Sequence, residues 1–370
     1  MNPKKIRVLV VDDSSVVRHA ISSALSRDPE IEVAGTASNP YEARDMILSL
    51  NPDVLTLDIE MPRMDGLTFM RILQKHRPTP VVVVSSLTPT GSRVALDALE
   101  AGAVDVMGKP GSAWSIGDLG TQLCQRVKGA AVASLRPANA PNTPSQRAGL
   151  ASSVRLNPRQ IILLGASTGG TEALKSVLNR LPDGLPGICI VQHIPPVFSN
   201  AFAARLNETC AFEVREAVSG DEIRPGLALV APGDYHMMVL WDSGHYRVVL
   251  NQGPPQHYTR PAVDMLFNSA AACAGGYAVA GLLTGMGSDG AQGMKKLKSA
   301  GAATIAQNEE TCVVYGMPRA AVELGAVDQI LPLDDIPGAL VHAVLTRTVA
   351  AHSNNNSNSS NKPSKQPRSV

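Results

Sequence analysis

Two blocks of alternating strand-like and helix-like patterns constrain the fold of this 370-residue chain more than any other feature. In the first block, short runs rich in valine and isoleucine alternate with segments whose apolar residues recur at helical spacing. The expected strands are IRVLVV, EVAGTA, VLTLD, VVVVSS and VDVMGKP, and the expected helices span 15–27, 41–50, 67–76, 92–101 and 117–129. This alternation is typical of a parallel sheet covered by helices, so we predict an α/β fold.

A second block begins at IILLGAS and continues through GICIVQH, GLALVAP, YAVAGLLTG and AATIAQ, with helix patterns at 170–180 and 291–300. The stretch between the blocks is rich in Ala, Pro, Ser and Asn. It shows neither the helical nor the strand periodicity of apolar residues, which indicates a flexible connector. The C-terminal residues are too polar to bury a core. We therefore predict a flavodoxin-like domain at 5–125, a linker at 126–157, a second doubly wound, mainly parallel α/β domain at 158–348 and a disordered tail at 349–370.

The composition excludes several classes of protein. Hydrophobic residues make up 44% of the chain and charged residues 18%, which is enough to bury ordinary cores without disulfides. A net charge of +1 and an aromatic content of 4% argue against nucleic-acid binding. The cysteines form no CxxC pair, and we find neither a signal peptide nor an apolar run of ~20 residues. We expect a cytoplasmic protein without membrane insertion.

Acidic residues follow two of the strands in the first block. Asp12 and Asp13 come after the first strand and Asp58 ends the third, so all three carboxylates should meet at the carboxyl edge of the sheet, where ligands bind. Carboxylates brought together repel one another, and Mg²⁺ with oxygen ligands relieves this repulsion. An aspartate there can attack phosphorus, with Ser85 and Lys109 donating to the phosphoryl oxygens. Alternatively, the Asp12–Asp13 pair is an ordinary helix N-cap.

These residues lie in segments that resemble the receiver domains of bacterial response regulators. The segments are VLVVDDSSVVR, LTLDIEMPRMDG, VVVVSS and GKP, and the resemblance covers nearly all of residues 5–125. It implies that Asp58 accepts a phosphoryl group from a chemotaxis histidine kinase. It also implies that Asp13, Asp58 and the backbone of Glu60 hold Mg²⁺.

The second block contains GASTGG, which fits the G-x-S-x-G nucleophile elbow around Ser167. Small neighbours are needed because the turn from strand to helix is sharp. At the N-terminus of a helix, unpaired N–H groups can stabilise an oxyanion. Two other interpretations are a helix N-cap at Ser167 and a phosphate cradle for a dinucleotide. The cradle is disfavoured because Gln192 and His193 stand where an acid is expected.

His193 and Asp289 complete a candidate catalytic set with Ser167. His193 follows the strand in GICIVQH, and Asp289 lies in TGMGSDG after another strand, so three strand ends supply a nucleophile, a general base and an orienting carboxylate. The chain order Ser, His, Asp differs from that of α/β-hydrolases, so we expect a different fold. Alternatively, His193 is a core histidine whose hydrogen bonds are all made within the protein, and Asp289 only forms a turn.

Four further polar residues are weaker candidates. We expect His236 and His257 to be structural or at the surface, because no second nucleophile accompanies them. Arg205 and Arg260 are candidates for substrate contact.

The second block resembles the catalytic domain of the chemotaxis protein-glutamate methylesterases. The similar segments are GASTGG, VQHIPPVFSNAFAARLN, RPAVDMLFNSAA, TGMGSDGAQGMKKLK and AQNEETCVVYGMPRAA, within about residues 158–345. The resemblance implies a triad of Ser167, His193 and Asp289, with the backbone at Met286 helping to hold the oxyanion and no cofactor at this site. It implies hydrolysis of glutamyl methyl esters on chemoreceptors, and deamidation of glutamine at the same serine.

Together, the two blocks predict a hydrolase controlled by phosphorylation, in which the unphosphorylated first domain packs over the Ser167 crevice. An alternative is a response regulator whose output domain binds receptors without catalysis. A DNA-binding output is disfavoured, because the second block has neither a short helix-turn-helix region nor a basic stripe.

Overall fold

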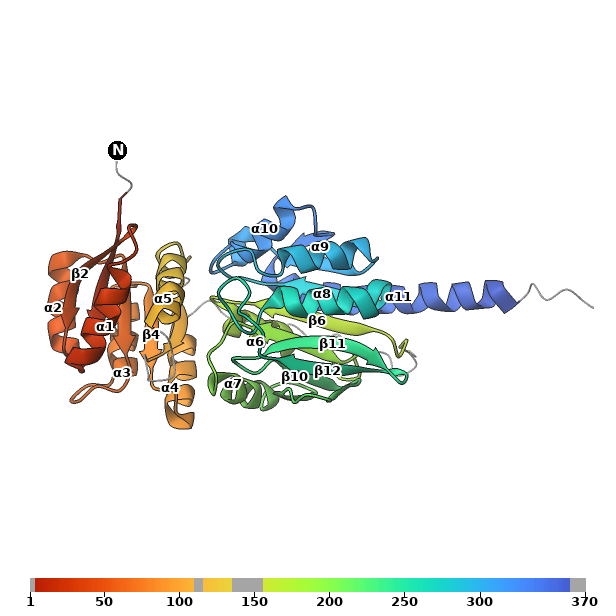
Figure 1. Ribbon diagram of the computed structural model, residues 1–370, viewed down its shortest axis with the longest axis horizontal. Helices are drawn as coiled ribbons and strands as arrows, with labels where there is room; N and C mark the ends of the chain where they lie inside the picture. The colour runs from red at the N-terminus through yellow and green to blue at the C-terminus, as the bar shows by residue number, and fades with distance from the viewer. Residues whose placement is uncertain (1–3, 110–115, 135–155, 360–370) are drawn as a thin grey trace, which may run out of the picture.

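Parallel strands form the centre of each half of the computed structural model, which describes residues 4–109, 116–134 and 156–359 (Figure 1). The first half has a five-stranded sheet in the order β2-β1-β3-β4-β5, with all pairs parallel. Its strands are β1 (Ile6–Val11), β2 (Ile31–Ala37), β3 (Val54–Asp58), β4 (Val81–Ser85) and β5 (Asp105–Gly108). Its helices are α1 (Ser15–Leu25), α2 (Pro40–Leu50), α3 (Gly66–His76), α4 (Pro89–Glu100) and α5 (Ile116–Ala131). This arrangement confirms the predicted flavodoxin-like fold.

The central strands β3 and β4 are buried along their whole length because helices cover both faces of the sheet. Helix α1 begins after Ser14, whose hydroxyl accepts a hydrogen bond from Val17 N at 3.4 Å. Asp12 instead accepts from the backbone of Ser14 at 2.8 Å. The residue that caps α1 is therefore Ser14, and the interpretation of Asp12 and Asp13 as the N-cap is wrong.

The second half has a seven-stranded parallel sheet in the order β15-β14-β13-β6-β7-β10-β8. Its strands are β6 (Ile161–Ala166), β7 (Ile188–Gln192), β8 (Glu213–Glu216), β10 (Leu227–Val230), β13 (Ala278–Leu282), β14 (Ala303–Gln307) and β15 (Gln329–Leu331). The chain runs from β6 to β7 on one side and places β13 on the other, so the strand order reverses at β6. Ligands bind outside the carboxyl ends of strands at such a switch point.

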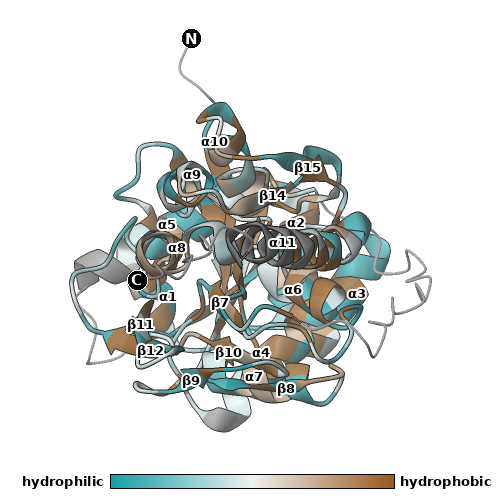
Figure 2. Cartoon of the chain, turned by 90° about the vertical axis from the view of Figure 1, so that its right-hand side faces the viewer, coloured by the Kyte–Doolittle hydropathy of each residue, from teal (hydrophilic) through white to brown (hydrophobic). Residues whose placement is uncertain are grey.

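Helices cover both faces of this sheet, as expected for a doubly wound domain. They are α6 (Gly170–Leu178), α7 (Phe198–Asn207), α8 (Val263–Cys273), α9 (Ala291–Ser299), α10 (Met317–Glu323) and α11 (Ile336–Ser359), with short 3₁₀ turns at Gly275–Tyr277, Glu309–Thr311 and Leu333–Asp335. Helix α11 packs on β13 and β14, and Figure 2 looks along it. Within the described part of the chain, no helix is long and apolar enough to cross a membrane.

Three features of the fold differ from the sequence-based expectation. Helix α5 continues to Ala131, so the first residues of the predicted linker at 126–157 are helical. Helix α11 continues to Ser359, into the tail that was predicted from 349; extending an existing helix requires no new nucleation. A three-stranded antiparallel sheet of β11 (His236–Asp242), β12 (His245–Asn251) and β9 (Glu222–Ile223) was not expected. The other boundaries remain predictions.

Candidate active site

Ser167 lies in the turn between β6 and α6, and glycines make this turn feasible. Gly169 has a φ of 75°, which favours glycine, and a Cβ there would lie 2.5 Å from the Val313 side chain. A Cβ at Gly165 would lie 2.4 Å from the Val263 side chain. The small residues around the serine are therefore required by backbone conformation and close packing, as a nucleophile elbow predicts.

The structure brings Ser167, His193 and Asp289 together at the ends of β6, β7 and β13. Ser167 Oγ lies 3.0 Å from His193 Nδ1, and His193 Nε2 lies 2.7 Å from Asp289 Oδ2. All three side chains are buried. Because an ionised carboxylate can only accept hydrogen bonds, Nε2 carries the proton. Nδ1 then has a lone pair toward the serine hydroxyl, so the imidazole can serve as a base.

Asp289 is held by backbone N–H groups as well as by His193. It accepts from Val263 N at 2.6 Å and Asp264 N at 2.9 Å, which belong to the first turn of α8, and from Gly290 N at 2.9 Å. Burial on its own would raise the pKa of Asp289. The hydrogen bond and charge of His193 and these backbone donors outweigh burial and lower the pKa, so Asp289 is ionised.

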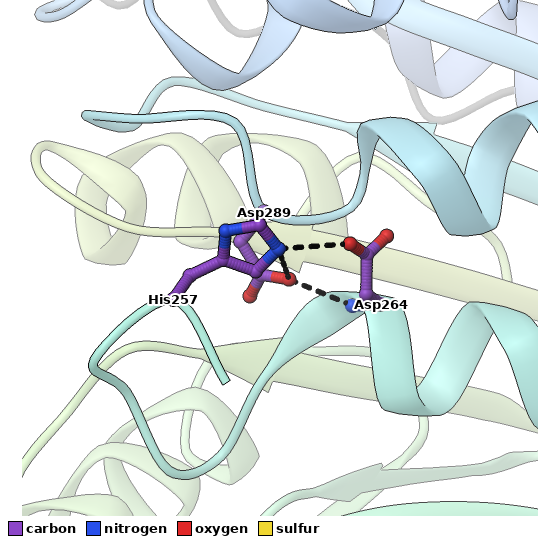
Figure 3. A group of neighbouring side chains, drawn as sticks. All are labelled: His257, Asp264 and Asp289. Carbon is purple, nitrogen blue, oxygen red and sulfur yellow. Dashed lines mark hydrogen bonds and ion pairs between the residues drawn. The ribbon is translucent and has the colours of Figure 1, made fainter. Parts of the chain in front are cut away.

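A second acid, Asp264, lies next to Asp289, and the sequence patterns did not predict its role. Figure 3 shows His257, Asp264 and Asp289 side by side, and we call these three residues the aspartate brace. Asp264 Oδ1 accepts from Gly293 N at 2.6 Å, and Oδ2 lies 3.1 Å from His257 Nε2. Burial, followed by the nearby charge of Asp289, raises the pKa of Asp264, while the bonds from Gly293 and His257 lower it.

The aspartate brace has three side chains whose ligand atoms are close enough to surround one cation. Each of its four carboxylate oxygens already accepts a backbone N–H or faces a histidine nitrogen. A metal ion would have to displace these bonds. The hydrogen bonds of the brace therefore indicate that it holds Asp289 in place, and they argue against a metal site. The prediction that His257 is structural or at the surface does not describe it fully, because His257 also lines the crevice beside Ser167.

A crevice of about 260 Å³ opens beside Ser167 and is lined by both halves of the chain. Met286 lines it, and among the described residues nothing accepts a hydrogen bond from the backbone N–H of Met286 or Thr168. Ser167 N, in contrast, is bonded to Thr284 O at 3.0 Å. Two backbone donors are thus available near the serine.

The first domain covers one side of this crevice. Thr168 Oγ1, next to the serine, donates to Asp105 Oδ2 of β5 at 2.7 Å, and Arg126 of α5 pairs with the same carboxylate. A Cβ at Gly129 of α5 would lie 3.5 Å from the Met286 side chain. In Figure 1, α4 and α5 stand between the first sheet and the second domain.

Arg205 and Arg260 have different partners. Arg205 of α7 bonds to Asp97 at 2.9 Å and also pairs with Glu100, both in α4 of the first domain. Arg260 pairs with Asp234 and lines a second, adjoining cavity. Arg205 is therefore an interdomain residue in this structure, and the suggestion of a substrate contact is not supported for it. His236 is buried and bonds to Pro254 O at 3.0 Å, as a structural histidine would.

The acids of the first domain form a separate group, which we call the receiver cluster: Asp12, Asp13 and Asp58. Each offers a carboxylate oxygen, and these oxygens lie within 4.8 Å of one another. Lys109 Nζ lies 2.7 Å from Asp58 Oδ2 and 3.3 Å from Asp12 Oδ2. Ser85 is buried at the end of β4, next to the Val84 that pairs with Asp58. All five predicted positions therefore lie at one sheet edge.

The electrostatics of the receiver cluster fit a cation. Burial raises the pKa of Asp58, Lys109 lowers it in part, and the charge of Asp12 raises it further. Asp12 Oδ2 is buried and has no hydrogen bond from any described residue, despite the ion pair with Lys109. An acidic group with a spare buried oxygen suits Mg²⁺, which prefers oxygen ligands.

Comparisons with known proteins agree with both resemblances. The response regulator receiver domain matches residues 8–117, and the CheB methylesterase family matches residues 162–340. A protein-glutamate methylesterase/protein-glutamine glutaminase of Syntrophus aciditrophicus is 50% identical over 342 residues, covering 92% of this chain and 99% of the relative. Another, of Anaeromyxobacter dehalogenans, is 52% identical over 334 residues, covering 90% and 94%.

The crystal structure of the Thermotoga maritima CheB methylesterase catalytic domain is 39% identical and covers 50% of this chain and 97% of that chain, with a TM-score of 0.49. The curated relatives match almost from end to end, so both domains and their order are shared. This chain therefore belongs to the family of protein-glutamate methylesterases/protein-glutamine glutaminases, in which a response regulator receiver domain is joined to a methylesterase domain.

Proposed function

We propose that this protein removes methyl esters from glutamate side chains of chemoreceptors, and deamidates glutamine side chains, with Ser167, His193 and Asp289 as its catalytic triad. The observation that carries the proposal is the continuous series of hydrogen bonds from Ser167 through His193 to Asp289, of 3.0 and 2.7 Å, beside an open crevice. The names of the curated relatives include both activities.

The geometry supports acyl transfer in two stages. His193 Nδ1 takes the proton of Ser167 while Oγ forms a bond to the substrate carbonyl carbon. Collapse of the tetrahedral intermediate breaks the bond to the methoxy or amino group, which leaves as methanol or ammonia with the proton from His193. Water then attacks the acyl carbon and loses a proton to His193. The bond between that carbon and Ser167 Oγ breaks, Oγ takes the proton back from His193, and glutamate is released. Asp289 stabilises the imidazolium throughout.

The backbone N–H groups of Met286 and Thr168 are the candidate donors to the oxyanion. Both lie at the crevice and lack an acceptor among the residues described, so they can bond to negative charge that develops on the substrate. Removing one such donor typically costs about 10²–10³ in kcat.

Replacement of the nucleophile tests the proposal. We expect Ser167→Ala to reduce methanol release from methylated receptor to background, with an unchanged melting temperature. Ser199→Ala is the control, because Ser199 is a buried serine of the same domain that bonds to Glu216 away from the crevice. Release at the wild-type rate by Ser167→Ala would instead support a receptor-binding output without catalysis.

For the receiver domain, the proposal is phosphorylation of Asp58 by a chemotaxis histidine kinase in the cytoplasm. Asp12, Asp13, Asp58 and the backbone of Glu60 would hold Mg²⁺, which when bound offsets the negative charge of the incoming phosphoryl group. Lys109 and Ser85 would then donate to its oxygens. The family membership and the spare buried oxygen of Asp12 support this assignment.

We also infer that the unphosphorylated receiver restrains the esterase, because Asp105 and Arg126 stand at the crevice beside Thr168. A docking equilibrium that shifts by a few kcal/mol would change activity substantially. With a small acyl-phosphate donor, methanol release by the wild type should rise, and Asp58→Asn should show no rise. Asp45→Asn, an exposed acid of α2, should respond like the wild type. Equal stimulation of all three proteins would refute control through Asp58.

A further inference from the structure

Gln192 connects the nucleophile to the base through the backbone. It is the last residue of β7, its side chain is buried, and Nε2 lies 2.8 Å from Ser167 O and 3.4 Å from His193 O. The carbonyl of Ser167 also accepts from Gly170 N at 2.7 Å. Since a carbonyl oxygen has two lone pairs, these two donors fully satisfy it.

The third glycine of GASTGG, Gly170, is explained by this side chain. A Cβ at Gly170 would lie 2.2 Å from Gln192 Oε1, so any larger residue there would displace the amide. Gln192 Oε1 itself is buried and accepts no hydrogen bond from any described residue. A buried acceptor without a partner is unfavourable, and an apolar residue of the same length would avoid it. The presence of an amide at this position therefore indicates that the hydrogen bonds donated by Nε2 have a role.

That use follows from where the sheet ends. The ladder between β6 and β7 ends at the pair Ala166 and Gln192, followed by one more bond from His193 N to Ala166 O at 3.1 Å. Beyond Ala166 in the chain, the Gln192 side chain is the only group among the described residues that links the Ser167 turn to the backbone of His193 by hydrogen bonds. The amide thus extends the connection between the two strands by one residue, to the position of the nucleophile.

We propose that Gln192 is a positioning residue, which fixes the Ser167 turn relative to His193 and so sets the approach of Ser167 Oγ to His193 Nδ1. The proposal rests on the proposed function of these two residues. Gln192 does not touch substrate in this account, so its loss should slow the chemical step and leave substrate binding almost unchanged. A misplacement of about 1 Å in such a pair can cost about 100-fold in rate.

The main test uses Gln192→Met, which keeps the length of the side chain and removes the donor. We expect kcat for methanol release to fall about 100-fold with KM within about twofold. Covalent labelling of Ser167 by a fluorophosphonate, which needs no receptor, should slow by a similar factor. All measurements use the full chain with the acyl-phosphate donor and Mg²⁺.

Gln160→Met is the matched control. Gln160 is also buried, also donates from Nε2 to a backbone carbonyl, that of Val344, and lies at the opposite end of β6. It should lose a comparable amount of thermal stability while keeping kcat and the labelling rate within about twofold. If Gln160→Met loses as much kcat as Gln192→Met at equal stability, the effect is general destabilisation and the proposal is wrong.

Gln192→Glu gives a second test that does not depend on the methionine variant folding well. When protonated, the new carboxyl can donate to Ser167 O, and when ionised it repels that oxygen. Burial raises the pKa of such a carboxyl. The ratio of the kcat of Gln192→Glu to that of the wild type should therefore fall as pH rises. A kcat ratio that does not change with pH, or a wild-type kcat in Gln192→Met, would overturn the proposed role of Gln192. Methanol release by Ser167→Ala at the wild-type rate would instead overturn the proposed function of the triad.

Discussion

The receiver cluster and the aspartate brace both lie at the carboxyl edge of a parallel sheet, and both could place three ligand atoms around one cation. They differ in how their oxygens are satisfied. In the receiver cluster, a buried oxygen of Asp12 has no hydrogen bond from the described residues, and the pKa of Asp58 is raised, mainly by burial. In the brace, every carboxylate oxygen has a partner, and bonds from His193 and the backbone overcome burial to lower the pKa of Asp289.

This difference shows how similar groups of acids can serve different chemistry. A cluster with a buried carboxylate oxygen that accepts no hydrogen bond from the described residues can bind a divalent cation and then a phosphoryl group. A cluster whose acids are neutralised by N–H donors keeps a carboxylate ionised and fixed, as an orienting partner of a histidine requires. The distinction depends on the supply of donors more than on the number of acids.

Chelation should separate the two clusters most clearly. With EDTA in excess, we expect phosphorylation of Asp58 by an acyl-phosphate donor to fall to background, because the proposed phosphoryl transfer depends on Mg²⁺ held by the receiver cluster. Basal methanol release should stay within about twofold, because the carboxylate oxygens of the brace already have hydrogen-bond partners. The measurements are phosphate incorporation and methanol release on the same sample, with Mg²⁺ restored as the control. Loss of basal hydrolysis on chelation would indicate a metal in the brace and would contradict the difference drawn between the two clusters.

Asp289→Asn should have a large effect on the rate of the esterase site. An asparagine amide can donate to His193 Nε2 and so favour the tautomer with a proton on Nδ1, which cannot accept from Ser167. We expect kcat to fall about 10⁴-fold. Asp328→Asn is the control, since Asp328 is an aspartate of the same domain that accepts from Thr304 and pairs with Lys298. A fall of less than tenfold would argue against the orienting role of Asp289.

The opposite pKa shifts of Asp289 and Asp58 predict opposite effects of pH on stability. The pKa of Asp289 is lowered from 3.8, so its stabilising contribution is present above that pH and is lost as pH falls through the lower folded value. The free energy of unfolding of the wild type minus that of Asp289→Asn should therefore shrink below about pH 4. Asp58 has a raised pKa, so the advantage of Asp58→Asn over the wild type should grow as pH rises above 3.8. Urea titrations without Mg²⁺ that gave the same sign for both variants would contradict these shifts.

Much of both sites could be predicted because their residues follow strands. Asp58, Lys109, Ser167 and His193 each end or follow an apolar run, and the carboxyl ends of parallel strands meet at one edge. Asp264 could not be found this way, because it lies in the first turn of a helix, where an acid usually stabilises the helix from the surface. Its signal was an acid in the otherwise apolar stretch AVDMLF.

The contacts between the domains could not be predicted at all. Arg205 lies in an ordinary helix with polar and apolar faces, and nothing in its spacing distinguishes an arginine that pairs with Asp97 from one that faces water. The short strand β9 was missed for a related reason, since two residues show no periodicity. Both features depend on partners distant in the sequence, while strand-end residues can be located from local patterns.

Arg205 also provides the prediction with the smallest effect, and it joins the two domains that contain the clusters compared above. Its ion pairs with Asp97 and Glu100 are partly exposed, and such pairs contribute about 0.2–1 kcal/mol each. Arg205→Ala should therefore loosen the receiver and raise basal methanol release by no more than about 30-fold, with little change once Asp58 is phosphorylated. Arg215→Ala removes a similar pair with Asp221 inside the catalytic domain and should change neither rate. If Arg205→Ala lowered the phosphorylated rate through a higher KM, Arg205 would belong to substrate binding, and the interface would be a contact of the resting state alone.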